Sequence, residues 1–189
     1  HQAGIGVILD WTPAQFPRYV SGLEKFDGTP LYERQNPAEA IHPFWGTLLY
    51  NYGSPMVKDF LISNACFWAE VYHADGLRMD DVDAMLYLDY GRNPGEWTPN
   101  IYGTNENLDA LEFLKHLNSV IKERNPGLLL VAQENGLWPE LTDSVGNDHL
   151  GFDYKWSGGW TKDLLEYLSK DPIERKNYHD QLTMSMLYA

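Results

Sequence analysis

The segment at residues 75–81 has the sequence DGLRMDD, and the fold can be predicted outward from it. Its centre is mostly apolar and it ends in two acids, which is typical of a buried β-strand with polar groups at its end. Side chains two residues apart share one face of a strand, so Arg78 and Asp80 should point together. Leu77 and Met79 should then point the other way. The segment predicts a strand with a charged pair at its carboxyl end.

Three similar apolar runs flank this strand, and helical patterns separate most of them. Pro55 follows a capping Ser54, and Asn125-Pro126-Gly127 ends a run of leucines spaced at threes. Strands that alternate with helices, joined by connections too long for hairpins, form right-handed βαβ units and a parallel sheet. We expect strands at 4–10, 75–81, 128–134 and 150–156, and helices at 55–73, 105–124 and 160–169.

The connections at 11–54 and 90–104 are irregular and rich in Pro, Gly, Tyr and Asn. Four strands form either a small open sheet or half of an eight-stranded barrel. No G-x-G-x-x-G or phosphate-binding loop follows the first strand, which disfavours the nucleotide-binding open sheets. Polar residues also end successive strands, where barrel enzymes place their chemistry: Asp10, Arg78 with Asp80, and Gln133 with Glu134. We predict a partial (β/α)8 TIM barrel, with 1–189 as a fragment of one catalytic barrel domain, about four consecutive parallel strands and long βα loops.

Composition limits the classes of partner. The chain has 189 residues and a formal charge of −13, which disfavours binding to nucleic acid or an anionic membrane surface. It contains no apolar run long enough to span a bilayer, and no histidine pair with metal-ligand spacing. The single cysteine, Cys66, lies in an apolar helical run and is expected in the core. Seven Trp and twelve Tyr weakly favour a carbohydrate partner, because aromatic faces stack on sugar rings but also fill cores.

Two interpretations of the strand-end acids remain open at this point. An arginine beside an aspartate stabilises the ionised carboxylate, as a nucleophile requires, but Arg78 and Asp80 could equally form an ordinary ion pair. Asp10 could likewise be a loop or helix cap.

A longer pattern decides between them. The chain carries GIGVILDWTPAQFP, DGLRMDDVDAMLYLDYGR and LLLVAQENGLWPE in this order, and the connecting segments include FDGTPLYE, FWGTLLYNYG, GEWTPNIYGTNENLDALEFL and GFDYKWSGGWTKDLLEYL. Together they resemble the glycogen and starch branching enzymes of the α-amylase superfamily. The resemblance runs almost from end to end and includes loops.

The resemblance implies a glycosyltransferase reaction on an α-1,4-glucan, and we expect no cofactor. With no signal segment, no internal disulfide and a storage-glucan substrate, we expect a cytoplasmic location. A carboxylate attacks the anomeric carbon, an acid protonates the leaving oxygen, and a 6-hydroxyl of another chain then receives the glycosyl group, forming an α-1,6 branch. In this sequence Asp80 matches the nucleophile and Arg78 the arginine that orients it. Asp10 matches an acid that binds at the same site.

The sequence departs from the family at three other positions. Gln15 stands where the relatives have a sugar-binding histidine, and Gln133 where they have the acid/base glutamate. An amide cannot supply the proton that a carboxylic acid supplies. Glu134 is the alternative acid/base, although a regular strand would turn it away from the site. Asp81 replaces a small residue and should point toward the barrel wall.

The family's third carboxylate lies on a later strand, and these 189 residues do not contain its motif. We therefore expect the isolated chain to be inactive. Two other functions remain open. One is a noncatalytic glucan-binding protein with a degenerate site. The other is a related trehalohydrolase or debranching glycosidase, which would share the aspartate strand.

Overall fold

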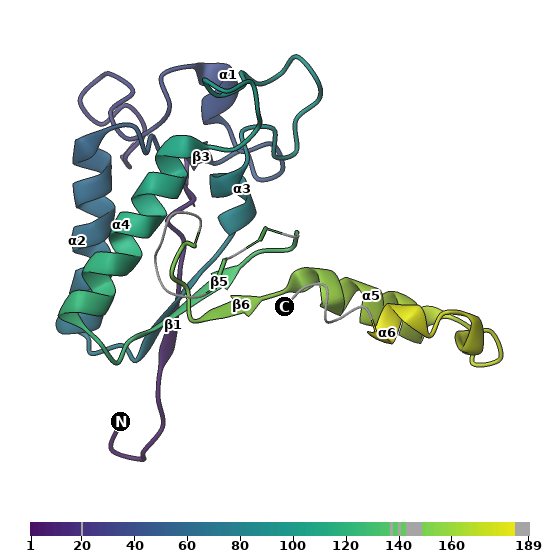
Figure 1. The fold of residues 1–189 in the computed structure, drawn as a ribbon. Coiled ribbons are helices and arrows are strands. Elements are labelled where there is room, and N and C mark those ends of the chain that lie inside the picture. Colours follow the sequence, from purple (N-terminus) through teal and green to yellow (C-terminus); the bar gives the residue numbers. More distant parts are fainter. Residues whose placement is uncertain (20, 137, 140, 143–148, 184–189) are drawn as a thin grey trace.

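The computed structural model describes residues 1–19, 21–136, 138–139, 141–142 and 149–183. At its centre lies a parallel sheet with the strand order β1-β4-β5-β6, so strands that follow one another in the sheet also follow in sequence (Figure 1). This order confirms the prediction of consecutive parallel strands. The strands are β1 (Ile8–Trp11), β4 (Gly76–Met79), β5 (Leu129–Gln133) and β6 (Tyr154–Trp156).

One face of the sheet is covered by two long helices, α2 (Pro55–Glu70) and α4 (Leu108–Arg124). The covered face carries the alternate apolar residues of the strands, such as Leu77 and Leu130, which are fully buried in the main hydrophobic cluster. The cap of α4 explains its first residue: the Asn107 side chain accepts a hydrogen bond from the backbone N–H of Ala110, so the helix begins at Leu108.

The opposite face of the sheet is largely open. Several of its apolar side chains are exposed: Ile8 to 50%, Tyr154 to 60% and Trp156 to 59%. A short apolar run such as the one at 4–10 is typical of a strand buried on both faces, but β1 is not such a strand. β1 is an edge strand, and among the described residues no second layer covers the face to which Ile8 and Asp10 belong.

The long connection between β1 and α2 has more structure than its sequence predicts. It contains a two-stranded antiparallel sheet of β2 (Gln15–Phe16) and β3 (Leu48–Leu49), and the short helix α1 (Pro37–Ala40). Another short helix, α3 (Val82–Leu86), follows β4 directly, and all five of its residues are buried. Both segments bring side chains to the carboxyl ends of the strands.

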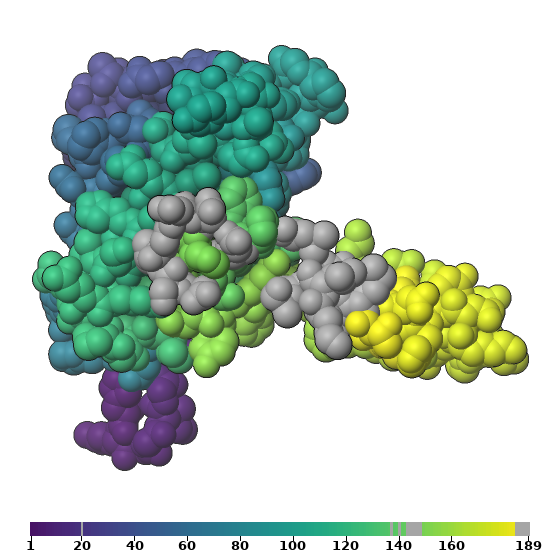
Figure 2. Space-filling model, in the orientation of Figure 1, coloured from purple at the N-terminus to yellow at the C-terminus, as the bar shows by residue number. Residues whose placement is uncertain are grey.

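The C-terminal part projects from this body (Figures 1 and 2). It consists of α5 (Gly158–Ser169), the 3-10 turn η1 (Arg175–Asn177) and α6 (Asp180–Thr183), and none of their residues is buried. The helix predicted at 160–169 therefore exists and begins two residues earlier. No helix in the described part of the chain combines the length and apolarity that a bilayer crossing needs.

Candidate functional site

Three of the predicted site residues meet at the carboxyl ends of β1 and β4. In the sheet Asp10 lies opposite Arg78, and the backbone N–H of Asp80 donates to the carbonyl of Trp11. The Arg78 guanidinium donates to Asp10 Oδ1 and to Asp80 Oδ1, each at 3.0 Å. The sheet register thus places two carboxylates on either side of one guanidinium.

Arg78 itself is held on the open face of the sheet. Its side chain is only 19% exposed, whereas those of Asp10 and Asp80 are 74% and 40% exposed. The guanidinium also lies over the ring of Trp156, 5.4 Å from its centre, on the last strand of the sheet. The arginine is therefore fixed by three partners and leaves the two carboxylates accessible to solvent.

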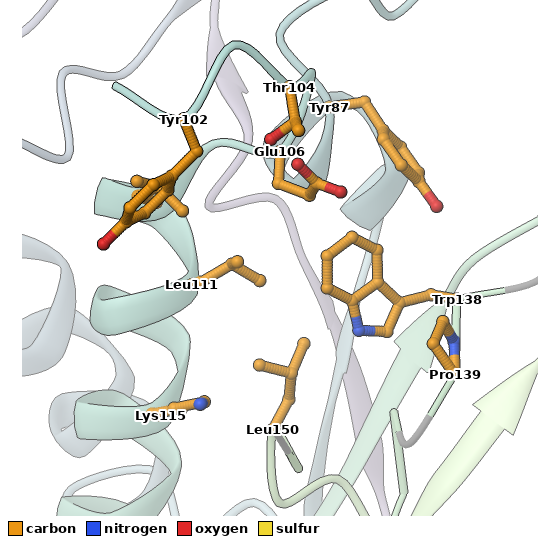
Figure 3. Close-up of a pocket in the computed structure, with 10 residues that line it drawn as sticks. Tyr87, Tyr102, Thr104, Glu106, Leu111, Lys115, Trp138, Pro139 and Leu150 are labelled. Carbon is orange, nitrogen blue, oxygen red and sulfur yellow. The ribbon is translucent and has the colours of Figure 1, made fainter. Parts of the chain in front are cut away.

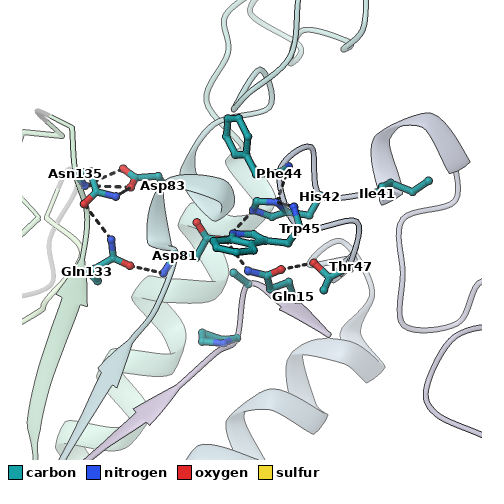
Figure 4. Close-up of polar contacts among 12 residues, drawn as sticks. Gln15, Ile41, His42, Phe44, Trp45, Thr47, Asp81, Asp83, Gln133 and Asn135 are labelled. Atoms are coloured by element: carbon teal, nitrogen blue, oxygen red, sulfur yellow. Dashed lines mark hydrogen bonds and ion pairs between the residues drawn. The ribbon is translucent and has the colours of Figure 1, made fainter. Parts of the chain in front are cut away.

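Gln133 lies at the carboxyl end of the neighbouring strand β5. Its Oε1 accepts a hydrogen bond from the backbone N–H of Asp81 at 3.0 Å, and its Nε2 donates to Asn135 Oδ1 at 3.0 Å (Figure 4). Glu134, by contrast, is fully buried and forms an ion pair of 2.7 Å with Lys155 Nζ. The alternation of a regular strand therefore separates Gln133 from Glu134, as the sequence predicts.

Asp81 lies differently from the prediction that it points toward the barrel wall. Its backbone is left-handed, with φ +59°, because β4 ends at Met79 and the chain turns into α3. Its carboxylate accepts hydrogen bonds from Gln15 Nε2 at 2.9 Å and from His42 Nε2 at 2.8 Å. The prediction is wrong because strand alternation does not continue through the turn, and Asp81 instead contacts a predicted site residue.

His42 is a member of this cluster that the sequence did not indicate. It is fully buried, and its Nδ1 accepts hydrogen bonds from the backbone N–H groups of Phe44 and Trp45. Nδ1 is thus an acceptor, which leaves the ring proton on Nε2 to donate to Asp81. A lone histidine in an irregular segment carries no spacing signal, so only the fold reveals it.

Gln15 is bonded at both ends of its amide. Nε2 donates to Asp81, and Oε1 accepts a hydrogen bond from Thr47 Oγ1 across the small sheet that β2 and β3 form. The exposed rings of Phe44 and Trp45 lie in the same turn, between His42 and Thr47. The candidate site therefore combines an amide that is held by hydrogen bonds with exposed aromatic rings.

A second buried cluster lies next to these strand-end residues. Asp83 on α3 accepts hydrogen bonds from the backbone N–H of Asn135 and from Asn135 Nδ2, the latter at 2.8 Å. Burial, followed by the hydrogen bond to Glu134, raises the pKa of Asp83 to about 7. Lys155 pairs with Glu134 there, and the N–H of Gly136 donates to the same carboxylate. This cluster was not predicted, because its members come from three separate segments.

A cavity among the described residues lies elsewhere. It measures about 470 Å³ and lies between the start of α4, the loop at 102–106 and Trp138 (Figure 3). Trp138 meets Tyr87 edge to face, with ring centres 5.4 Å apart. The cavity contains none of the predicted site residues.

Two further observations bear on chemistry. No group of three or more His, Cys, Asp or Glu residues within the described ranges is arranged to hold a metal ion. Cys66 is buried in α2, and burial raises the pKa of its thiol. Its predicted place in the core is confirmed.

Curated proteins that are similar to the chain in sequence include 1,4-alpha-glucan branching enzymes. The chain is 53% identical to the 1,4-alpha-glucan branching enzyme of Methylococcus capsulatus over all 189 residues, which are 26% of that protein. It is 52% identical to the branching enzyme of Thermobifida fusca, again over its whole length and over 25% of the relative. The chain thus spans about a quarter of the length of these curated relatives. No protein-family model matches it.

Solved structures show the fold. An α-amylase from Anoxybacillus superposes with a TM-score of 0.63 and 14% identity, covering all of this chain and 38% of that one. A maltogenic α-amylase from Thermotoga neapolitana superposes with a TM-score of 0.62 and 12% identity, covering all of this chain and 37% of that one. The α/β chain with four parallel strands therefore has the fold of a segment of these enzymes. Along its entire length, the chain is similar in sequence to a segment of 1,4-alpha-glucan branching enzymes.

Proposed function

We propose that this chain is the part of a glucan-branching barrel that carries the nucleophile. The observation that carries the proposal is the Asp10–Arg78–Asp80 cluster at the carboxyl ends of adjacent parallel strands. The Arg78 guanidinium holds both carboxylates in place, and Asp80 is the one that the family resemblance matches to the nucleophile. Residues 1–189 would form one portion of a single catalytic barrel domain.

The proposed reaction proceeds with retention at the anomeric carbon. An oxygen of Asp80 forms a bond to that carbon while the α-1,4 bond breaks, and an acid at position 133 gives its proton to the leaving oxygen. A 6-hydroxyl of a second chain then attacks the glycosyl-enzyme, displaces Asp80 and returns its proton to position 133. Arg78 orients Asp80, and Asp10 and Gln15 bind sugar hydroxyls. The substrate is a storage α-glucan, and the location is cytoplasmic.

Gln133 limits this chemistry in the chain as it stands. Its amide has no proton to give at neutral pH, and loss of general acid catalysis lowers a rate by roughly 10²–10⁴-fold. The third carboxylate, expected on a later strand of a longer protein, is also needed. The proposal is therefore that the 189-residue chain alone does not turn over substrate.

One observation favours a second function, binding of glucan without catalysis. Gln133 and Gln15 are each bonded to protein groups at both amide atoms, so the edge is well ordered although it lacks an acid at position 133. Ordered amides and the exposed rings of Phe44 and Trp45 suit recognition of a neutral sugar.

Linkage analysis distinguishes these functions. The matching segment of the Methylococcus capsulatus enzyme is replaced by this chain carrying Gln133→Glu, and amylose is the substrate. We expect new α-1,6 linkages in the product spectrum and their loss in the Asp80→Asn variant. Free reducing sugar without new branches would contradict branching. Retention of amylose on the folded chimera with no change of linkage would support the binding function instead.

A further inference from the structure

A line of three hydrogen bonds runs through the candidate site from Asp81 to Asp83 (Figure 4). Along this line each residue donates to the next. The backbone N–H of Asp81 donates to Gln133 Oε1, Gln133 Nε2 donates to Asn135 Oδ1, and Asn135 Nδ2 donates to Asp83 Oδ2. The distances are 3.0, 3.0 and 2.8 Å. The first and third links join different segments, so the line connects the end of β4, the end of β5 and α3.

Asp83 determines which way the Asn135 amide points. Asp83 Oδ2 accepts the hydrogen bonds of Asn135 in either protonation state, because a protonated Asp83 directs its proton to Glu134. The NH₂ group of Asn135 must therefore face Asp83. A reversed amide would set its oxygen against Oδ2 of Asp83 and leave a buried acceptor without a donor, which is unfavourable. The backbone N–H of Asn135 also donates to Asp83, at 3.0 Å, and holds the two residues together.

With Asn135 held in this way, only its oxygen faces position 133. The side chain at 133 therefore needs a donor toward Asn135 and an acceptor toward the N–H of Asp81. A carboxamide supplies both groups, and so does a protonated carboxyl group. An ionised carboxylate supplies two acceptors, one of which would face the oxygen of Asn135.

We infer that Asp83 and Asn135 are positioning residues that hold a hydrogen-bond donor on the side chain at position 133. The inference rests on the proposed function, because it concerns the position of the acid in that reaction. A glutamic acid at this position would be kept in its protonated form, which is the form that donates to a leaving oxygen. Gln133 is then the uncharged counterpart of that acid, in the same orientation.

Charges around the edge also act on such a carboxyl group. Asp80, Asp81, Asp83 and Glu134 favour its protonated form, whereas Arg78 and Lys155 favour its ionised form. The test therefore has to separate the Asn135 hydrogen bond from these charges. Asn135→Ala does so, because it removes the amide and leaves every charge in place.

The experiment measures the titration of the carboxyl introduced by Gln133→Glu in the 189-residue chain, by carbon-detected NMR. We expect its pKa to lie above the ordinary value of about 4.3 and to fall by about one unit or more, tenfold in proton affinity, when Asn135→Ala is added. Asn105→Ala is the matched control, because the Asn105 amide bonds Asp89 in another loop, and it should leave the titration unchanged. A pKa at or below about 4.3, or one that Asn135→Ala does not move, overturns the inference.

A double-mutant cycle tests the part played by Asp83. Asp83→Asn should lower the pKa of the introduced carboxyl by more when Asn135 is present than when it is alanine, because part of its effect acts through the orientation of the amide. Equal shifts in both backgrounds would show that Asp83 acts through its charge alone and would overturn its assignment as a positioning residue.

A measurement on the unaltered side chain covers the case in which Gln133→Glu does not fold. The carboxamide protons of Gln133 should exchange with solvent at least about tenfold faster in Asn135→Ala than in the original chain, while those of Gln35 should not change. Unchanged exchange at Gln133 overturns the inference. The proposed function fails separately: if the pKa pattern holds but the chimera makes no branches, the positioning assignment stands and branching does not.

Discussion

At the scale of single residues, the site depends on where carboxyl groups are placed relative to water. Asp10 and Asp80 remain accessible beside Arg78, whereas Asp83 and Glu134 are buried next to each other with Lys155. The accessible pair suits chemistry on a substrate. The buried pair holds the end of β5 in place, and its position makes stability depend on pH.

The stability of the chain should depend on pH through Asp83. Its pKa is about 7 in the folded chain and about 3.9 when unfolded, so between these values only the folded state holds the proton. The free energy of unfolding should therefore fall as pH rises from about 4 to about 7, by at most about 1.4 kcal/mol per pH unit for one proton. Urea unfolding across this range measures the slope.

Asp83→Asn should flatten that slope, and Asp59→Asn, which removes an exposed carboxyl from α2, should leave it as it is. If the original chain and Asp83→Asn had parallel profiles, the proton on Asp83 would not be the cause.

Residue-level prediction succeeds where strand geometry applies and fails where it ends. Gln133 and Glu134 separate as expected because β5 is regular up to Gln133. Asp81 could not be placed from the sequence, because a left-handed residue after β4 reverses the direction that alternation implies. His42 and Thr47 lie about thirty residues from Gln15 in sequence, and only the pairing of β2 with β3 brings them to it.

At the scale of secondary-structure elements, the short helices and strands position many of the site residues. α1, α3, β2 and β3 have two to five residues each, too few to show a helical or strand period in the sequence. The long helices α2 and α4 were predictable because they repeat their apolar positions over several turns. Their predicted ends were less accurate, since caps such as Asn107 decide them.

Arg92 should be important for the short elements. Its guanidinium donates to the carbonyls of Ala38, Glu39 and Ile41, at 2.7, 3.0 and 2.8 Å, at the end of α1. Cations stabilise the exposed carbonyls of a helix C-terminus. We expect Arg92→Met to cost about 1–3 kcal/mol of unfolding free energy and to shift the ring resonances of His42, which follows α1.

Arg18→Met is the control, because Arg18 is exposed and pairs with Glu24 alone among the described contacts. It should cost less than about 1 kcal/mol. Equal losses for the two variants, with the His42 resonances unmoved, would show that Arg92 does not hold this turn.

At the scale of the whole molecule, the sheet has one covered and one open face. The predicted order of strands and the half-barrel architecture both follow from the alternation of strands and helices, and the α-amylase superpositions agree with them. What the pattern could not supply was the exposure of the strands, because apolar runs look the same whether or not a second layer covers them.

The open face should make the isolated chain bind a hydrophobic dye and associate at high concentration. Ile8 belongs to that face, so Ile8→Thr should reduce dye binding. Ile173→Thr makes the same chemical change at an exposed position near η1 and should not. Sharp cooperative unfolding of a monomer that binds no dye would contradict this account.

The most direct test of the central claim is the branching rate of the chimera described above, with Gln133 and with Gln133→Glu, per mole of folded protein. Glutamine and glutamate are nearly isosteric, so the change should leave the fold intact and restore the proton. We predict a gain of at least about 10²-fold, the low end for general acid catalysis. Glu134→Gln should remove far less activity, because Glu134 is buried against Lys155. A chimera that is fully active with Gln133 and is silenced by Glu134→Gln would contradict the account, and Glu134 would then be the acid.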